Sequence, residues 1–148
     1  FIGVPPFAHG DIELACCAKG LHMLIEKPIA IDCAMAKPIL KAIEDSGVVT
    51  AVAYKYRWDD HVIKAKEMLQ GRTLGLVWGN FWGSLPGAPW WRVQEQSGGQ
   101  MVEQTTHIVD MARYFAGDVV FAKLPLVLAG EFFASLLHVK LWRAHVAS

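Results

Sequence analysis

The segment GLHMLIEKP, residues 20–28, decides the fold of this chain. Within it, residues 22–25 are predicted to form a short buried strand, because a compact apolar run is followed at once by the polar turn Glu26-Lys27-Pro28. Two further apolar runs flank this strand, at residues 1–4 and 48–54. The first of them stops at Pro5-Pro6, as a strand that enters a loop would. The sequence therefore predicts three strands among the first 54 residues.

Helical patterns fill the two gaps between these strands. In residues 9–19 the apolar side chains of Ile12, Ala15 and Cys16 recur at helical spacing, and a glycine follows as a stop signal. Asp32 is placed to cap a second helix that runs to residue 46, with Gly47 behind it. Strands that alternate with helices of this length pair in parallel through right-handed crossovers. The predicted fold class is α/β, and residues 1–56 are assigned to half of a doubly wound parallel sheet.

Secondary-structure signals follow a different order after Arg57. The pattern predicts a helix over residues 61–70, an aromatic strand over 76–82, a loop over 85–98 and a helix over 99–115. We therefore place a domain boundary here, with residues 57–120 as part of a second, α+β domain.

The tail, residues 121–148, does not continue this pattern. Its apolar run is interrupted by Glu131, His138 and Lys140, which makes it a poor membrane span. An amphipathic or buried helix is the alternative, and the sequence assigns the tail no function.

Composition and charge exclude some classes of partner. Apolar residues make up 53% of the 148 residues and charged residues 19%, so a packed core is expected rather than disorder. Fourteen lysines and arginines balance 14 aspartates and glutamates. This balance argues against nucleic acid or an anionic membrane surface as the main partner, because both are held by excess positive charge.

The cysteines and the first residues bear on location. Cys16, Cys17 and Cys33 show no metal-ligand spacing, so we predict no metal site and expect free thiols in a reducing cytoplasm. The chain opens on Phe1 without an initiating methionine or a basic leader, so we expect a fragment of a cytoplasmic protein.

The turn Glu26-Lys27-Pro28 carries the first sign of chemistry. It lies at the carboxyl end of a predicted parallel strand, where open α/β sheets bind their ligands. Pro28 disfavours a helical conformation for Lys27, so the ammonium is expected to extend beyond the strand end. A partly desolvated lysine there can exchange a proton with a substrate hydroxyl. The alternative is an ordinary polar turn.

Two successive strand ends of this kind would lie side by side. The chain reads VPPFAH at residues 4–9 and GLHMLIEKP at residues 20–28. On these motifs the chain resembles the glucose–fructose oxidoreductase/inositol dehydrogenase (Gfo/Idh/MocA) family, in which a TPxxxH-like strand end precedes an EKP strand. The resemblance implies NAD or NADP as cofactor. It also implies that residues 1–56 are the C-terminal half of a dinucleotide-binding, Rossmann-like domain and that residues 57–120 are part of an α+β substrate and dimerisation domain. It implies that Pro5, Pro6 and His9 line the nicotinamide–ribose region, that Glu26 bonds the ribose, and that Lys27 faces both nicotinamide and substrate, with Pro28 and Arg57 among the cofactor contacts. The tight turn and the resemblance also raise the expectation of a cis Lys27–Pro28 bond well above its usual frequency.

The stretch SGGQMVEQTTHIVD, residues 97–110, extends the resemblance. On one helix Glu103, His107 and Asp110 would share a stripe, and apolar residues would occupy the opposite side. An ordinary solvated face is the alternative. In the family this stripe supplies an acid–histidine pair, so Glu103 would orient His107, which would exchange the substrate hydroxyl proton, and Asp110 would contact the substrate. The family more often has aspartate at Glu103 and a third glycine at Ser97.

The resemblance implies an enzyme, an NAD(P)-dependent oxidoreductase acting on a secondary alcohol of a sugar, inositol or related polyol. Trp91 and Arg92 are candidate substrate contacts, since aromatic faces suit sugar rings, although loop tryptophans more often pin a loop to the core. No G-x-G-x-x-G motif occurs in the chain, and we expect it upstream of Phe1. The fragment itself is therefore expected to be inactive, and the parent to be a homo-oligomer. A non-catalytic, dinucleotide-binding regulatory member and a truncated inactive product are the alternatives.

Overall fold

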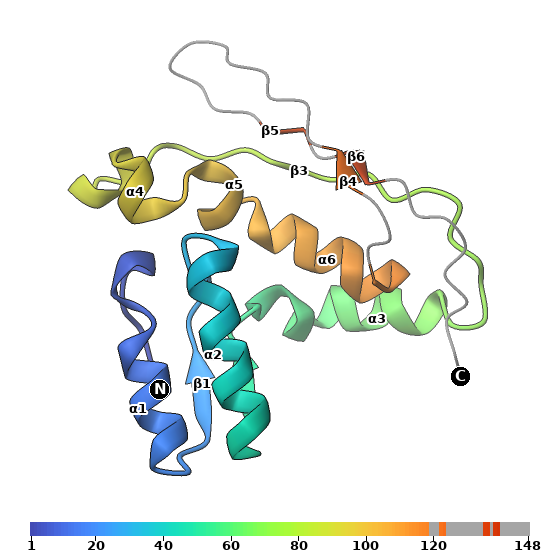
Figure 1. Cartoon of the computed structure of the whole chain (residues 1–148). Helices are drawn as coiled ribbons and strands as arrows, with labels where there is room; N and C mark the ends of the chain where they lie inside the picture. The colour runs from blue at the N-terminus through green and yellow to red at the C-terminus, as the bar shows by residue number, and fades with distance from the viewer. Residues whose placement is uncertain (119–121, 124–134, 137, 140–148) are drawn as a thin grey trace. The chain divides into compact units, whose positions relative to one another are not determined.

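The computed structural model describes residues 1–118, 122–123, 135–136 and 138–139. The chain divides into two compact units (Figure 1). The first unit consists of Phe1–Tyr54 and Leu85–Glu103, and the second unit of Lys55–Ser84 and Gln104–Ser148.

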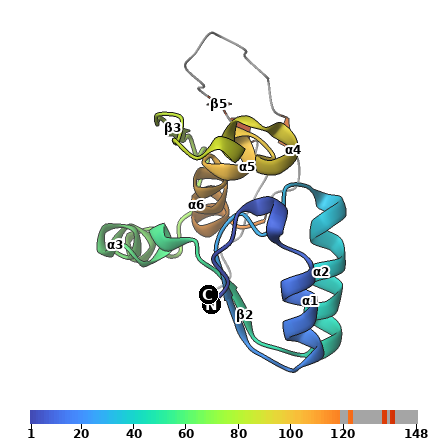
Figure 2. The same cartoon turned by 90° about the vertical axis from the view of Figure 1, so that its left-hand side faces the viewer.

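A small parallel sheet forms the centre of the first unit. Strand β1 (Met23–Ile25) pairs in parallel with β2 (Thr50–Val52), and Ile2 makes a parallel bridge to Ile25. The three strand segments therefore lie where the sequence predicted them and pair in parallel as predicted. Helices α1 (Asp11–Ala18) and α2 (Cys33–Ser46) connect them (Figures 1 and 2).

The predicted first and last residues of α2 are confirmed. The Asp32 carboxylate accepts a hydrogen bond of 2.8 Å from the Met35 N–H, which satisfies one of the unpaired donors of the first turn. Gly47 ends the helix with a φ of 67°, a left-handed conformation that costs glycine little.

The core of the first unit lies between the sheet and the two helices. Its buried residues are Ile2, Cys17, Met23, Ile25 and Val48. Helix α1 buries Glu13 and Cys17 and leaves Ile12 and Ala15 exposed. The side of the helix that faces the core is therefore not the side that the apolar spacing predicted. The physical reason is that Glu13 bonds a buried histidine, described below, and this fixes the rotation of the helix.

Short helical turns occupy the segment that was predicted to be a loop. They are η3 (Pro89–Arg92), α4 (Gln94–Ser97) and α5 (Gln100–Glu103). Pro89 suits the first position of η3, because a proline there lacks only an N–H that the turn would leave unpaired. Figures 1 and 2 both draw α4 and α5 at the end of the first unit where α1 and α2 begin, the end where the parallel strands finish.

The second unit contains η2 (Lys55–Trp58), α3 (Asp60–Met68) and α6 (Thr106–Ala116). The segment predicted to be a tail contains three short strands, β4 (Ala122–Lys123), β5 (Ser135–Leu136) and β6 (His138–Val139). Strand β6 pairs antiparallel with β4, and β5 pairs antiparallel with β3 (Asn80–Phe81), which precedes the tail. The predicted strand over 76–82 is therefore reduced to two residues. The helical alternative for the tail is wrong at these positions, and the rest of that expectation lies outside the described residues.

The predicted single helix over 99–115 is also wrong. Two residues, Gln104 and Thr105, separate α5 from α6. Consecutive threonines, Thr105 and Thr106, are weak helix formers because branching at Cβ restricts their side chains. The interruption places Glu103 on one helix and His107 on the other.

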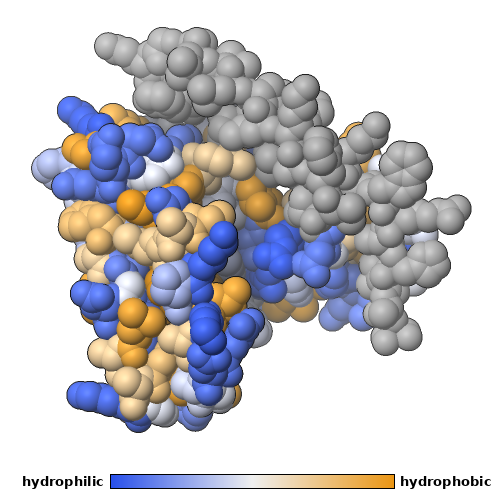
Figure 3. All heavy atoms as spheres, in the orientation of Figure 1, coloured by the Kyte–Doolittle hydropathy of each residue, from blue (hydrophilic) through white to orange (hydrophobic). Residues whose placement is uncertain are grey.

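The described surface mixes polar and apolar side chains. Figure 3 shows apolar residues scattered among polar ones over the face formed by α1 and α2. The exposed apolar residues of these two helices include Ile12, Leu14 and Leu40. Scattered apolar residues are normal for a globular surface. Within the described part of the chain, no helix has the length and apolar character needed to cross a bilayer.

Candidate active site

Lys27 and Glu103 meet at the carboxyl end of β1. The Lys27 ammonium donates a hydrogen bond of 2.6 Å to the main-chain oxygen of Glu103 and lies 3.5 Å from its carboxylate Oε2. The Lys27 side chain is 19% exposed and that of Glu103 is 4% exposed. The ammonium is thus held in place at the strand end, which an ordinary polar turn would not require.

The turn that carries Lys27 has the expected backbone. The Lys27–Pro28 bond is cis, as predicted. Beyond it, the Ile31 carbonyl approaches Gly98 so closely that a Cβ on Gly98 would lie 2.7 Å from the Ile31 oxygen. Gly98 also has a φ of 71°. Only glycine fits both conditions, so this position lets the segment before α5 pack directly on the turn after β1.

Glu103 is a buried acid with an incomplete set of partners. Burial raises the pKa of Glu103 above its usual range, and the positive charges of Lys27 and His9 offset part of that rise. Its Oε1 atom is buried and has no hydrogen-bond partner among the described residues. An unsatisfied buried polar atom costs about 1–3 kcal/mol. A ligand group that donates a hydrogen bond to Oε1 would recover that cost.

A second buried pair, His9 and Glu13, follows the strand segment that contains Ile2. His9 Nδ1 is 2.5 Å from Glu13 Oε1, and both side chains are fully buried. The Gly10 N–H donates to the other oxygen of Glu13 at 2.7 Å, while His9 Nε2 is buried with no partner among the described residues. The sequence analysis included His9 but missed Glu13. The spacing of four residues at the start of a helix is the signal that would have found it.

The remaining predicted residues of the first unit are placed as follows. Pro6 is buried, whereas Pro5 and Glu26 are half-buried. Within η3, Trp91 is half-buried and Arg92 is exposed. The neighbouring Trp90 ring makes an edge contact with Phe7, with centroids 6.5 Å apart, so this tryptophan does pin its segment to the loop before α1.

The second unit holds the other predicted residues. His107 packs on the Tyr56 ring with centroids 4.8 Å apart, and Arg57 forms a two-pronged pair with Asp110 at 2.8 and 2.5 Å. His107 is 7% and Asp110 4% exposed. The solvated-face alternative is therefore wrong, because these side chains, like Glu103, are buried. Tyr56 is the contact that sequence reasoning did not assign to His107.

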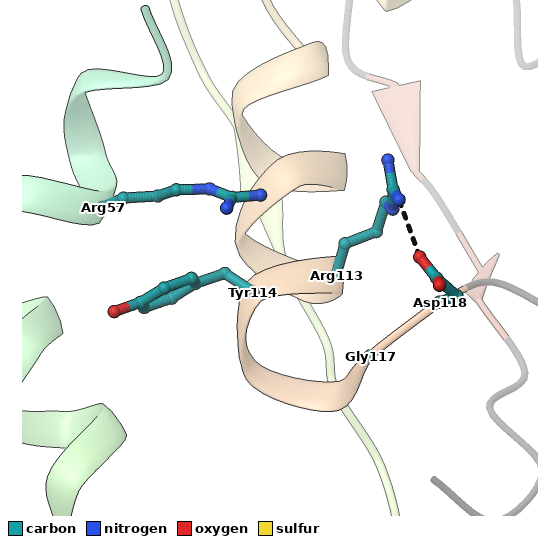
Figure 4. A pocket seen from close by; sticks show the side chains of 5 residues that line it. All are labelled: Arg57, Arg113, Tyr114, Gly117 and Asp118. Carbon is teal, nitrogen blue, oxygen red and sulfur yellow. Dashed lines mark hydrogen bonds and ion pairs between the residues drawn. The ribbon is translucent and has the colours of Figure 1, made fainter. Parts of the chain in front are cut away.

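A polar pocket of about 280 Å³ opens beside this pair. Figure 4 shows the Arg57 side chain extending along the Tyr114 ring, 5.2 Å from its centroid, while Arg113 turns to Asp118. The Arg113–Asp118 ion pair measures 2.6 Å. Both guanidinium groups that line the pocket are thus engaged by carboxylates.

The structure brings Lys27 and Glu103 together in the first unit, and Arg57 and Asp110 together in the second. That Lys27 and His107 share one cleft, and that Glu103 orients His107, stay predictions. Across the described ranges of the chain, no group of three or more histidine, cysteine or acidic side chains is arranged to hold a metal ion.

Parallel strands joined by crossover helices are the arrangement of a Rossmann-type fold, and such sheets bind their ligands at the carboxyl ends of the strands, where Lys27 lies. Residues 1–54 match the family model described as "Oxidoreductase family, NAD-binding Rossmann fold", and residues 57–128 match an oxidoreductase C-terminal domain. The chain belongs to the Gfo/Idh/MocA family of oxidoreductases. The predicted family and the α/β fold class are confirmed.

Several relatives are sugar or inositol dehydrogenases. Levoglucosan dehydrogenase of Pseudarthrobacter phenanthrenivorans is 31% identical over 126 residues, which cover 79% of this chain and 32% of that protein. The scyllo-inositol 2-dehydrogenase (NAD(+)) of Bacillus subtilis is 26% identical over 117 residues, 78% of this chain and 34% of that protein. The chain thus spans about a third of the length of these relatives.

Solved structures agree on the fold. A levoglucosan dehydrogenase in complex with NADH and levoglucosan superposes with a TM-score of 0.76 at 26% identity, over 86% of this chain and 37% of that one. A dehydrogenase from Chromobacterium violaceum has a TM-score of 0.75 at 23% identity, over 88% of this chain and 40% of that one.

Proposed function

We propose that the whole protein is an NAD(P)-dependent oxidoreductase that oxidises a secondary alcohol of a sugar, inositol or related polyol, or catalyses the reverse reduction. The observation that carries the proposal is the Lys27 ammonium, fixed at the carboxyl end of β1 by Glu103. Family membership and the sugar and inositol dehydrogenases among the relatives support it.

Lys27 has the hydrogen-bonding capacity that this role requires. An ammonium has three N–H donors. One is given to the Glu103 main-chain oxygen and a second lies near its carboxylate, which leaves a third for a ligand oxygen. When bound, the nicotinamide ring would accept or give the hydride. Lys27 would donate to the reacting oxygen and stabilise the negative charge that develops on it as the proton leaves.

The residues present suit the nicotinamide end of NAD or NADP. The loops that carry Pro5, Pro6 and His9 and that carry Glu26 and Pro28 follow adjacent parallel strand segments. His9 Nε2, a buried polar atom without a partner among the described residues, is a group that a polar ligand would satisfy. We assign these residues to the nicotinamide and its ribose. The sequence has no G-x-G-x-x-G motif to hold the pyrophosphate.

Four further residues are proposed to contact the substrate. His107 would exchange the hydroxyl proton, and its burial against Tyr56 limits the orientations of the imidazole. Asp110, Trp91 and Arg92 are proposed to bind other polar groups of the substrate. Arg57 is paired with Asp110, so its first effect would be to fix that carboxylate.

The test is a spectrophotometric assay of the whole protein with NAD and NADP against a panel of sugars, inositols and acyclic polyols. Substrate-dependent formation of NADH or NADPH that is lost in Lys27→Ala supports the proposal. Tight dinucleotide binding without turnover of any panel member, or of the matching ketones, would favour the non-catalytic alternative. We further propose that the protein is cytoplasmic, because its three cysteines are free and a reducing compartment keeps thiols free. We also propose that the whole protein is a homo-oligomer.

A further inference from the structure

We propose that Glu13 is a positioning residue of the proposed active site: it holds the imidazole of His9 in the tautomer that carries the hydrogen on Nδ1, so that Nε2 accepts a hydrogen bond from the nicotinamide half of the bound dinucleotide. The inference rests on the proposed function, because it takes the ligand from there. It adds the residue that sets the hydrogen-bonding role of His9, and it names the kind of ligand group that His9 recognises, which is a donor.

The contact between the two side chains is direct. His9 Nδ1 lies 2.5 Å from Glu13 Oε1, and both side chains are fully buried. A carboxylate only accepts hydrogen bonds, so the hydrogen in this contact belongs to Nδ1. In a neutral imidazole the other nitrogen, Nε2, is then an acceptor.

The Glu13 carboxylate is also held on its other side. The N–H of Gly10, the residue before α1, donates to Glu13 Oε2 at 2.7 Å. One carboxylate oxygen therefore binds the start of the helix and the other binds His9, so the carboxylate cannot turn without losing a contact. Capping the helix needs only the first oxygen. The second oxygen orients the imidazole, as carboxylates do for histidines at metal and catalytic sites.

The Nε2 atom of His9 is the one left for a ligand. It is buried and has no hydrogen-bond partner among the described residues. A buried acceptor without a donor is costly, so a ligand that supplies the donor is favoured there. His9 follows the strand segment of Ile2, which pairs with β1 at Ile25. It therefore lies beyond the carboxyl ends of the parallel strands, where such sheets bind ligands and where Lys27 lies.

The nicotinamide half of NAD or NADP offers two kinds of donor. One is the carboxamide N–H₂ on the ring, and the other is a hydroxyl of the adjacent ribose. Both can donate to Nε2 in the tautomer that Glu13 selects, whereas the carboxamide oxygen needs a donor from the protein. The tautomer of His9 thus determines which groups of the cofactor this side chain can bind.

Glu13→Gln is the decisive variant, because it inverts the tautomer and keeps the helix start. Its amide oxygen is the acceptor that the Gly10 N–H requires, so the amide N–H₂ faces Nδ1 and the imidazole hydrogen moves to Nε2. Asp11→Asn is the matched control, since it removes an exposed carboxylate from the same first turn.

The tautomer is read from two-bond ¹H–¹⁵N spectra of the whole protein, labelled at histidine and assigned with His9→Asn. The spectra are recorded at about pH 8.5, where an ordinary imidazole is neutral. The form with the hydrogen on Nδ1 is expected in the wild type and in Asp11→Asn. The form with the hydrogen on Nε2 is expected in Glu13→Gln.

Cofactor titration of the whole protein measures the consequence for binding. Glu13→Gln is expected to weaken the binding of NADH or NADPH by about tenfold or more, and Asp11→Asn by less than about twofold. The reduced 3-acetylpyridine analogue, which has a methyl group in place of the carboxamide N–H₂, identifies the donor. Equal affinity of this analogue for the wild type and Glu13→Gln assigns the carboxamide, and a loss equal to that of the natural cofactor assigns a ribose hydroxyl.

A wild-type spectrum with the hydrogen on Nε2, or with hydrogens on both nitrogens, would overturn the inference without any variant. Unchanged cofactor affinity in a Glu13→Gln protein whose tautomer is inverted would also overturn it. If the tautomer and the cofactor affinity change as expected but the wild type oxidises no polyol, the proposed function fails and the inference stands. Polyol oxidation by a wild type that has the other tautomer has the opposite meaning.

Discussion

The Lys27 ammonium lies 2.6 Å from the main-chain oxygen of Glu103, although 76 residues of sequence separate the two. This contact joins the EKP turn to the segment that follows the two glycines.

Lys27→Ala in the whole protein is expected to lower kcat by about 10²- to 10⁴-fold, the range typical of acid–base groups. It should also weaken cofactor binding, because Lys27 is proposed to touch both ligands. Steady-state kinetics and NADH titration by tryptophan fluorescence quenching measure the two effects. Lys41→Ala is the control, because it removes an exposed lysine of α2 that pairs only with Asp45 among the described residues. It should change neither kcat nor the affinity for NADH.

His107→Ala should also lower kcat by about 10²- to 10⁴-fold but leave the affinity for NADH nearly unchanged. The reason is that His107 is proposed to contact substrate and not cofactor. The same kinetics and titration provide the comparison with Lys27→Ala. Normal turnover by His107→Ala, on a substrate that the parent accepts, would remove His107 from the mechanism.

Glu103→Gln should change how stability depends on pH. Burial raises the pKa of Glu103 above its usual 4.5 in the folded state, so the stability that comes from burying the neutral acid is fully present below pH 4.5 and is lost as the pH rises through the raised pKa. The variant has no proton to lose, so its stability relative to the wild type should increase from pH 4 to pH 7. Urea denaturation across this range measures it, with the exposed Glu95→Gln as control. In the activity assay Glu103→Gln should lose less than His107→Ala, because it keeps a hydrogen-bonding side chain.

Gly98→Ala should destabilise the chain more than Gly47→Ala. Both glycines have a φ near 70°, but a Cβ on Gly47 would meet nothing within 4 Å, whereas one on Gly98 would lie 2.7 Å from the Ile31 oxygen. Gly47→Ala is therefore expected to cost about 1 kcal/mol for the left-handed backbone alone. The excess cost of Gly98→Ala, read from urea denaturation, measures the close approach. If both variants lost the same free energy of unfolding, the Ile31 carbonyl would be able to move away from the new Cβ without cost.

The 148-residue chain by itself should bind NADH and NADPH weakly. Its sequence contains no G-x-G-x-x-G turn, whose backbone N–H groups and helix N-terminus hold the pyrophosphate. Isothermal titration calorimetry of the isolated chain, with the whole protein as the positive control, tests this. Affinity equal to that of the whole protein would contradict it.

Local sequence signals determined most of the first unit. Apolar runs that end at Pro5-Pro6 and at Glu26-Lys27-Pro28 marked the strands, and Asp32 and Gly47 marked the limits of α2, because caps and turns depend on residues close in sequence. The same signals were too weak for the second unit. The strand predicted over 76–82 pairs over only two residues, since strand length depends on the partner and not on the strand's own pattern.

Tertiary structure decided the candidate site. Helical spacing predicted that Glu103, His107 and Asp110 share one helix, but the chain breaks between α5 and α6 and buries all three. Spacing also favoured Ile12 and Ala15 as the buried face of α1, which instead turns Glu13 inward to His9. Periodicity reports which side chains share a face. Whether that face meets water, a carboxylate or a carbonyl 76 residues away depends on segments that only folding brings together, and at buried ionisable groups the free energy of those contacts outweighs local preference.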